Sequence, residues 1–600
     1  MDWPRWEREL DRLALHGVNL PFVLTGHEAV IQRAFRGLDP GLDDAGVRAF
    51  LGGPAYLPFV TMGCLAGWDG PATQGWVDRR AELGARVIGR ARELGMRPVL
   101  PGFAGHVPQQ LAGRASTQVV DWTGFTTHAL DPTDPLFADL GERYVAAQRE
   151  LFGGTDHLYL ADPFIESVPP AQTLDEVAAT AAAVYEGMRR GDPDATWVFQ
   201  SWPFTYQEDY WSADRIRAFL GAVPDDRTII LDLWSEHRPV TAALGSGKPW
   251  LWCMLHNFGG RPGMYGKLGT VATAPAASGA VGLGATMEDD RGDPVLYELL
   301  ADVAWSGAVD LDSWLPGWVD ARYGRVDAET GDALRRAWGL LRDTVYAADA
   351  PGPPGAVLLR RPVADGDLVP APFLLSEAPR WRQVPDELWT AWELLAGAAT
   401  AIASTGPDAA RTAIGRDLAD VAYLVVGTLG DHAQAEAASA YLAGDEAAFA
   451  AAARRFLTGI EDLERLLATR PEYLLGRWLA DAASWGETGD ERHAYEADAR
   501  RILTLWGPPD GALVDYARRG WSGLLGTYYL PRWRRWVDAL GSALRAGRPV
   551  DPVAFDADLR TFDAAWVEDG PAAGTLPTEP SGDTAAVACD LYARWHSRPT

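Results

Sequence analysis

Short runs of β-branched and aromatic residues alternate with longer amphipathic stretches from residue 1 to about residue 309. This pattern predicts parallel strands joined by crossover helices. Most of the runs are nearly continuous in apolar residues, as expected when both faces of a sheet are covered. A closed barrel of this type needs eight strands. The seven predicted strands are residues 18–24, 97–103, 157–164, 196–202, 228–234, 249–256 and 280–287.

The chain opens on a predicted helix with Asp2 as its cap, Pro4 in its first turn and Gly17 as its terminator. No strand pattern precedes this helix, so we expect a (β/α)8 TIM-type barrel whose first strand is missing. An open seven-strand sheet would leave two edges without a neighbour. Further predicted helices cover residues 171–190 and 294–305.

After residue 310 the pattern changes to segments rich in Ala, Leu and Arg with helical spacing, for example 445–469 and 512–540. We therefore expect two domains, a catalytic barrel at 1–309 and an α-helical domain at 310–600. The Pro- and Gly-rich stretches 350–355 and 570–582 are predicted loops.

The overall composition argues against several classes of binding partner for this chain. A net charge of −28 disfavours nucleic acid, anionic membranes and heavily sulfated polymers. Three scattered cysteines indicate neither a zinc site nor a disulfide framework. We find no membrane-spanning run and no signal peptide, so the chain as written is expected in the cytoplasm, or outside the cell if its true start lies upstream. The 26 Trp suit either sugar stacking or core packing.

Two acidic residues, Glu166 and Glu288, close two of the predicted strands. Barrel enzymes place reactive groups at the carboxyl ends of strands, so both side chains would point into one mouth. Two carboxylates that flank a glycosidic bond suffice for its hydrolysis. A single Glu at a strand end is more often an ion-pair partner, and only the pair in a Trp-rich barrel suggests chemistry.

Two other motifs carry weaker signals. The acidic run from Glu288 to Asp290, together with Asp293, does not have the spacing of a calcium loop. The Gly-rich segment 279–284 lies in a predicted strand and has no phosphate-binding Lys after it. We therefore expect neither a metal nor a nucleotide there.

Long segments in fixed order resemble the α-N-acetylglucosaminidases of glycoside hydrolase family 89 over nearly the whole chain. The resemblance implies a barrel followed by a helical domain, hydrolysis of terminal α-linked N-acetylglucosamine with retention, and no metal or other cofactor. It also implies that Glu166 is the acid/base and Glu288 the nucleophile. The matching segments include residues 6–9, 62–63, 68–71, 98–108, 252–260, 505–508, 513–517 and 528–533.

The same resemblance implies a sugar pocket to which the helical domain contributes. Trp202 and Trp506 have an alternative role in packing between domains, and His106 and His256 an alternative role as hydrogen-bonding groups behind the pocket. The residues implied to bind substrate are Trp68, Trp122, Ile165, Trp202, His256, Trp506 and Tyr516.

The chain departs from the family pattern at two points. Ile165 stands where the family usually has Asn beside the sugar's 2-substituent, and an aliphatic side chain cannot donate a hydrogen bond there. Family members also carry a small N-terminal domain and a first barrel strand before the helix that opens this chain.

The leading hypothesis is a retaining exo-glycosidase for terminal α-linked N-acetylglucosamine. The alternatives are a glycosidase for a different 2-substituted α-glycoside and a carbohydrate-binding protein without turnover. The sequence does not decide the oligomeric state, and a homo-oligomer is one of the alternatives.

Overall fold

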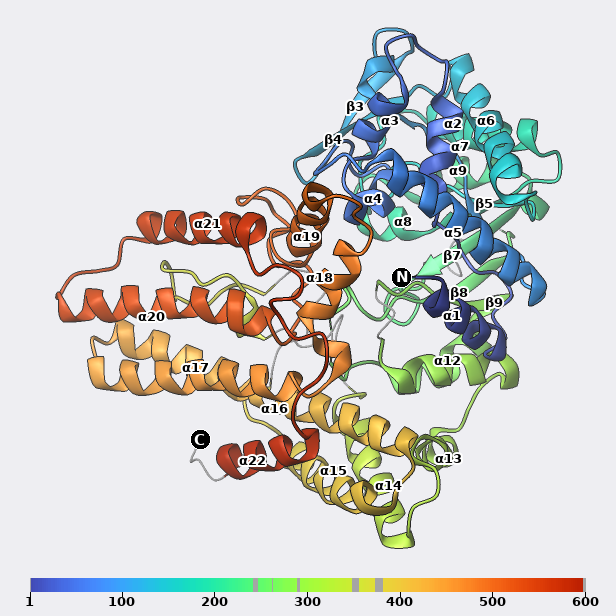
Figure 1. The fold of residues 1–600 in the computed structure, drawn as a ribbon. Coiled ribbons are helices and arrows are strands. Elements are labelled where there is room, and N and C mark those ends of the chain that lie inside the picture. Colours follow the sequence, from blue (N-terminus) through green and yellow to red (C-terminus); the bar gives the residue numbers. More distant parts are fainter. Residues whose placement is uncertain are drawn as a thin grey trace. The chain divides into compact units, whose positions relative to one another are not determined.

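The computed structural model describes residues 2–240, 247–261, 263–288, 292–347, 356–372 and 381–596, apart from the side chain of Thr405 (Figure 1). The chain packs into two compact units. The barrel unit consists of Met1–Leu255 and Ala274–Thr286, and the helical unit of His256–Thr273 and Met287–Thr600. The division falls within helix α11 (Leu268–Ser278). The domain boundary expected at residue 309 stays a prediction.

A parallel sheet forms the centre of the barrel unit, with strand order β1-β5-β6-β7-β8-β9. Residues beside β1 extend it, because Phe22 forms a parallel bridge with Val99 and the Val99 amide donates to the Pro21 carbonyl at 2.9 Å. The strands are β1 (Leu100–Pro101), β5 (Leu158–Leu160), β6 (Thr196–Gln200), β7 (Thr228–Leu233), β8 (Trp250–Met254) and β9 (Gly282–Ala285).

All seven predicted strand positions are therefore found, in the predicted order, and the TIM-barrel class with a helical C-terminal region is confirmed. The predicted lengths were wrong in several places. The strand expected at 157–164 pairs only over Leu158–Leu160, because the chain turns at Phe164, whose φ is 61°. Glu166 and Glu288 accordingly lie in loops beyond β5 and β9, rather than on the strands.

Both faces of the sheet are largely buried over β5 to β8, whereas β9 at its edge is only partly buried. On one face Leu158, Leu160 and Val198 form a core cluster with Val99. On the other face the rings of Trp197 and Phe199 pack against Phe219 of α9. Because successive strand residues point to opposite faces, a parallel sheet buried on both sides requires the near-continuous apolar runs seen in the sequence.

Helices cover the sheet, and α5, α6 and α7, drawn from blue to cyan in Figure 1, pack in sequence against one another. The opening helix is confirmed, because the Asp2 side chain accepts from the Arg5 amide. The helices of this unit are α1 (Trp3–Leu15), α2 (His27–Phe35), α3 (Asp44–Leu51), α4 (Leu57–Thr61), α5 (Gln74–Glu93), α6 (Pro135–Phe152), α7 (Leu174–Gly191), α8 (Trp202–Tyr206) and α9 (Ala213–Gly221).

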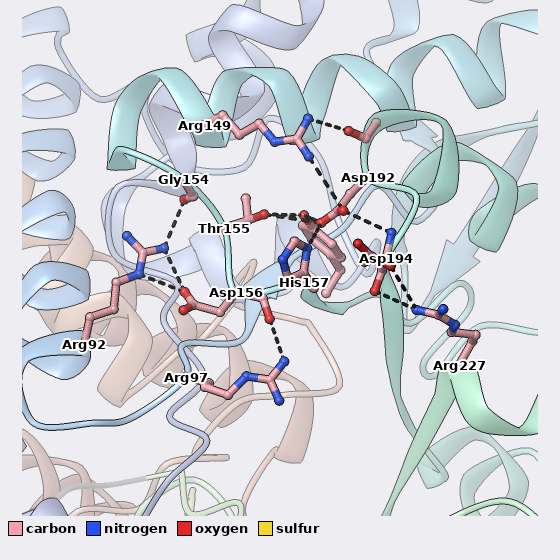
Figure 2. Close-up of polar contacts among 12 residues, drawn as sticks. Arg92, Arg97, Arg149, Gly154, Thr155, Asp156, His157, Asp192, Asp194 and Arg227 are labelled. Carbon is pink, nitrogen blue, oxygen red and sulfur yellow. Dashed lines mark hydrogen bonds and ion pairs between the residues drawn. The ribbon is translucent and has the colours of Figure 1, made fainter.

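The amino ends of β5 and β6 are joined by a network of polar contacts (Figure 2). Asp192 accepts from the His157 ring and from the Tyr159 hydroxyl, each at 2.7 Å. Burial alone would raise the pKa of Asp192, but these two hydrogen bonds hold it below its ordinary value. Arg92 binds the Asp156 carboxylate at 2.7 Å. Polar contacts at this end of a barrel stabilise the fold, while the opposite end carries the chemistry.

A second, antiparallel sheet was not predicted. It is inserted between β1 and α6, with strand order β2-β4-β3. Its strands are β2 (His106–Val107), β3 (Thr117–Trp122) and β4 (Phe125–Leu130).

The helical unit is built largely from long helices joined by short turns, and α16 and α17 pack together along their lengths (Figure 1). One predicted helix, 512–540, was wrong in its first half, where the chain forms turns up to a π-helical segment at Leu525–Tyr529. Among the described helices, none is both long enough and apolar enough to cross a membrane. The helices here are α12 (Pro294–Ser306), α13 (Leu311–Tyr323), α14 (Ala328–Thr344), α15 (Asp386–Thr405), α16 (Asp408–Leu442), α17 (Glu446–Leu467), α18 (Leu475–Ala483), α19 (Gly489–Leu503), α20 (Leu530–Arg545), α21 (Pro552–Asp569) and α22 (Thr584–His596).

The crossing of α6 and α7 yields a stability test. A Cβ atom added at Gly141 would lie 2.5 Å from the Gly187 Cα, so Gly141→Ala should force the two helices apart and destabilise the protein by about 1–3 kcal/mol. Gly89→Ala on α5 is the matched control, since nothing lies within 4 Å of its added Cβ, and it should be neutral or stabilising by about 0.5–1 kcal/mol. Denaturant unfolding measures both. Equal effects would contradict the close crossing.

Candidate active site

Glu166 lies in the loop after β5, and each of its carboxyl oxygens accepts a hydrogen bond from an indole. Trp122 Nε1 donates to Oε2 at 2.7 Å, and Trp202 Nε1 donates to Oε1 at 2.8 Å. The Gln207 side chain donates to the Glu166 carbonyl at 2.7 Å. The structure therefore brings three of the predicted site residues into direct contact within the barrel unit.

Trp122 reaches Glu166 from the end of the inserted β3–β4 hairpin. The turn consists of Thr123 and Gly124, with φ values of 48° and 91°, as expected for the tight two-residue turns that suit the twist of a hairpin. The Trp122 ring stacks on Phe59 at 6.0 Å. Beneath the hairpin, Val120 forms a buried cluster with Ala129 and Phe164. This packing joins the hairpin to the loop that carries Glu166.

Trp202 is positioned by the two residues before it. Asp162 accepts from the Gln200 backbone amide at 2.8 Å and from its side-chain amide at 2.6 Å. Ser201 donates to the buried Asp232 at 2.9 Å. Burial raises the pKa of Asp162 to about 7, although the hydrogen bonds from Gln200 oppose the change. Two buried carboxyl groups thus fix the start of α8.

The remaining predicted residues of the barrel unit lie beside this cluster. Trp68 is half-buried, and its ring meets the edge of Phe125 at 5.2 Å. Ile165 is buried, with 4% of its surface exposed. His106 packs against Phe164, and burial lowers its pKa to about 4. Gly63 must lack a side chain, since an added Cβ would lie 1.9 Å from the His106 ring. His106 is therefore a neutral packing group.

Glu288 lies in the helical unit and accepts from the Gly259 backbone amide and from the Tyr516 hydroxyl, the latter at 3.0 Å to Oε2. Its own amide donates to the Asn257 side chain at 3.3 Å. The residue is exposed by surface area, yet the protein around its carboxyl reduces hydration and raises its pKa. The donors from Gly259 and Tyr516 and the charges of Arg261 and Arg519 oppose that rise.

Tyr516 is held in place by a buried ion pair. Its neighbour Asp515 has a left-handed backbone with a φ of 60° and binds both terminal nitrogens of Arg532, at 2.9 and 3.1 Å. Arg532 also pairs with Asp563 at 3.3 Å. A β-carbon on Gly259 would lie 2.7 Å from the Tyr516 carbonyl. The ion pair of Asp515 with Arg532 therefore holds the loop that carries Tyr516 in its left-handed conformation. The backbone of Tyr516 lies so close to residue 259 that only glycine fits there.

His256 and Trp506 lie in the helical unit, as Glu288 does. The His256 Nε2 donates to the Tyr265 carbonyl at 2.8 Å, and burial lowers its pKa to about 4. Trp506 is 2% exposed and has a φ of 59°. Their roles at the sugar stay predictions.

Sequence reasoning missed the groups behind the site. Asp162 stands in the same segment as Glu166, and the alternating pattern with a Thr-Gly turn at 117–130 was visible as a hairpin signal. The ion pair of Asp515 with Arg532 joins residues far apart in the sequence, so no local sequence pattern predicts it. Asp289 and Asp290 lie outside the described residues. Within the part of the chain that is described, no group of three or more His, Cys, Asp or Glu side chains is arranged to hold a metal ion.

Comparison with solved structures gives two strong matches. Both are from Clostridium perfringens: one is in complex with its substrate GlcNAc-alpha-1,4-galactose, and the other is a family 89 glycoside hydrolase in complex with 2-acetamido-1,2-dideoxynojirmycin. Each has a TM-score of 0.88, with 28% and 29% identity over 98% and 99% of this chain. This chain spans 66% and 67% of their lengths.

Comparison by sequence points the same way. Human alpha-N-acetylglucosaminidase is 36% identical over the whole of this chain and 80% of its own length. Residues 1–307 match the model of the alpha-N-acetylglucosaminidase (NAGLU) tim-barrel domain, and residues 314–594 match that of the C-terminal domain. These matches cover both halves of the chain, which therefore belongs to the alpha-N-acetylglucosaminidase family.

Proposed function

We propose that this chain is a retaining exo-glycosidase that releases terminal α-linked N-acetylglucosamine, with Glu166 as acid/base and Glu288 as nucleophile. The observation that carries the proposal is a pair of glutamates in the loops after β5 and β9, each with its own set of hydrogen-bond donors. The relatives support the choice of sugar, since one clostridial structure holds GlcNAc-alpha-1,4-galactose as its substrate.

The proposed reaction has two steps. In the first, Glu166 gives its proton to the glycosidic oxygen while the Glu288 carboxylate attacks the anomeric carbon, so the leaving group departs and a glycosyl ester forms. In the second, Glu166 takes a proton from water, which attacks the same carbon and frees Glu288. Two inversions leave the configuration of the sugar unchanged.

The aromatic residues around the two glutamates suit a sugar ring, because indole and phenol faces cover its apolar side. We assign this role to Trp68, Trp122 and Trp202 in the barrel unit and to Trp506 and Tyr516 in the helical unit, with His256 behind them. Ile165 is the proposed neighbour of the sugar's 2-substituent.

The first test is hydrolysis of p-nitrophenyl α-N-acetylglucosaminide. Glu288→Gln should lose at least about 10³-fold in rate, since it removes the nucleophile, and Glu166→Gln about 10²–10⁴-fold in the second step. Because p-nitrophenolate is a good leaving group that needs no proton, Glu166→Gln should complete the first step and show a burst of product. Azide needs no general base, so it should restore turnover in the second step. Glu142→Gln, on an exposed face of α6, is the control. Full activity of either catalytic variant would refute the assignment.

A second test concerns the ionisation of Glu288. Tyr516→Phe removes a donor that favours the carboxylate and lowers the pKa of Glu288. A nucleophile must be ionised, so activity rises as pH increases through its pKa. Loss of the donor should therefore move the acidic limb of the kcat/KM profile to higher pH by about one unit. An unmoved limb would contradict the contact.

A third test concerns specificity. Ile165→Asn introduces a side-chain donor next to Glu166 and should raise kcat/KM on the N-acetylglucosaminide by about 3–10-fold, as expected for one neutral hydrogen bond. The α-glucoside without the acetamido group serves as the control substrate. A gain on both substrates, or on neither, would argue that residue 165 does not face the 2-substituent.

A further inference from the structure

Two segments of the helical unit meet at Glu288. One follows β8 and supplies the Asn257 side chain and the Gly259 amide, and the other carries Glu288 itself. Because Gly259 donates to the Glu288 carboxyl and Asn257 accepts from its amide, the position of the first segment decides how the carboxyl is held. The groups that fix this segment therefore bear on the ionisation of the proposed nucleophile.

Tyr265, at the far end of the segment after β8, is bound through both polar groups of its backbone. Its carbonyl accepts from His256 Nε2 at 2.8 Å, and its amide donates to Asp293 Oδ2 at 3.5 Å. The His256 and Tyr265 rings also stack, with centroids 5.5 Å apart. Since His256 directly precedes Asn257, these contacts tie the two ends of the segment together into a loop.

Asp293 joins this loop to the rest of the helical unit. The segment that carries Glu288 enters α12 at Asp293, which has 7% of its surface exposed. The Tyr346 hydroxyl, which follows α14, donates to the same Oδ2 atom at 2.5 Å. Burial raises the pKa of Asp293 to about 6, although Tyr346 and Arg416 oppose the change. One buried oxygen thus ties both segments at Glu288 to α14.

Close packing around Asp293 leaves little freedom to either segment. A Cβ on Gly266, the last residue before the chain leaves the loop, would lie 2.3 Å from the Leu296 side chain of α12. Arg416 Nη2 of α16 donates to the Gly292 carbonyl at 3.1 Å. The neighbours of both contacts to Asp293 are therefore held as well.

We propose that Asp293 is a positioning residue for Glu288. Its Oδ2 atom fixes Tyr265, and Tyr265 fixes the loop that holds the nucleophile. This inference rests on the proposed function. When the carboxyl of Asp293 is removed, the Tyr265 amide loses this acceptor, the loop shifts, and the Gly259 amide moves away from Glu288.

The proposal fixes the direction in which the pKa of Glu288 changes. Loss of the Gly259 donor disfavours the carboxylate and raises the pKa. Loss of the Asp293 charge alone would lower it, since removing a negative charge favours a nearby carboxylate. An upward change therefore reports lost positioning. The other charged groups that act on these two carboxyls stay in place in every variant, and they are Arg261, Arg416, Asp417 and Arg519.

Infrared titration of the Glu288 carboxyl tests the role without substrate, with the band assigned by its loss in Glu288→Gln. Asp293→Ala removes the acceptor, so the midpoint should rise by about one pH unit. Asp293→Asn is the matched rescue and should keep the wild-type midpoint, because one amide oxygen can accept both hydrogen bonds. If Asp293→Ala does not fold, Tyr346→Phe replaces it and should raise the midpoint by about half a unit.

Asp462→Ala is the control for lost stability. Asp462 has 4% of its surface exposed and accepts from Arg594 at 2.7 Å and from the Trp595 indole at 3.0 Å. These contacts join α17 to α22 and involve neither segment at Glu288, so the midpoint should not move. A midpoint that stays fixed or falls in Asp293→Ala, or rises equally in Asp293→Asn or in the control, would overturn the positioning role.

Turnover of p-nitrophenyl α-N-acetylglucosaminide gives a second readout. Misplacement of the nucleophile in Asp293→Ala should lower kcat/KM, which reports the first step, by about 10–100-fold. The acidic limb should move up with the infrared midpoint, and Asp293→Asn should restore both. An equal loss in Asp462→Ala would contradict the proposal. Failure of the proposed function would instead appear as absence of wild-type turnover and leaves the infrared titration readable.

Discussion

The parallel direction of the barrel strands is the constraint on which the site depends. Parallel strands need a crossover after each one, so every loop at their carboxyl ends begins at the same edge of the sheet. Glu166, Trp122 and Trp202 are distant in sequence, yet each belongs to a segment that starts where β5, β1 or β6 ends. The polar network at the amino ends (Figure 2) anchors the strands from the other side and leaves this edge free for chemistry.

Buried carboxyl groups, in addition to apolar packing, fix the side chains that contact the two glutamates. Asp162 and Asp232 hold the residues before Trp202, and Asp515 with Arg532 holds the loop of Tyr516. Buried carboxyl groups are costly unless hydrogen-bonded, and each of these is satisfied by a group one or two residues from a site residue or by a buried Arg. The free-energy cost of burying these carboxyl groups is therefore incurred next to the side chains that contact Glu166 and Glu288.

The sequence predicted the strand order and the helical second half because both rest on periodic apolar patterns. It placed Glu166 and Glu288 at strand ends, whereas both lie in loops beyond β5 and β9, and their shared role at one site stays a prediction. It missed the inserted sheet because the strand prediction relied on near-continuous apolar runs, whereas the hairpin alternates polar and apolar residues and β2 is only two residues long. It also placed a helix over 512–524. That segment is rich in helix formers, but buried ion pairing of Asp515 and left-handed backbone at Asp515 and Arg518 override the local preference.

The surroundings of the two glutamates differ in kind, and this difference fits their proposed roles. Reduced hydration disfavours the ionised form of Glu288, while the Tyr516 hydroxyl, the Gly259 amide and nearby arginine charges favour it. These groups all belong to the helical unit. A nucleophile needs one ionisation state, so permanent donors suit it. Glu166 has to be an acid in one step and a base in the next. Its two indole donors come from different elements, the inserted hairpin and the start of α8. The insertion of a small antiparallel sheet after β1 is the feature of the fold that brings Trp122 to Glu166.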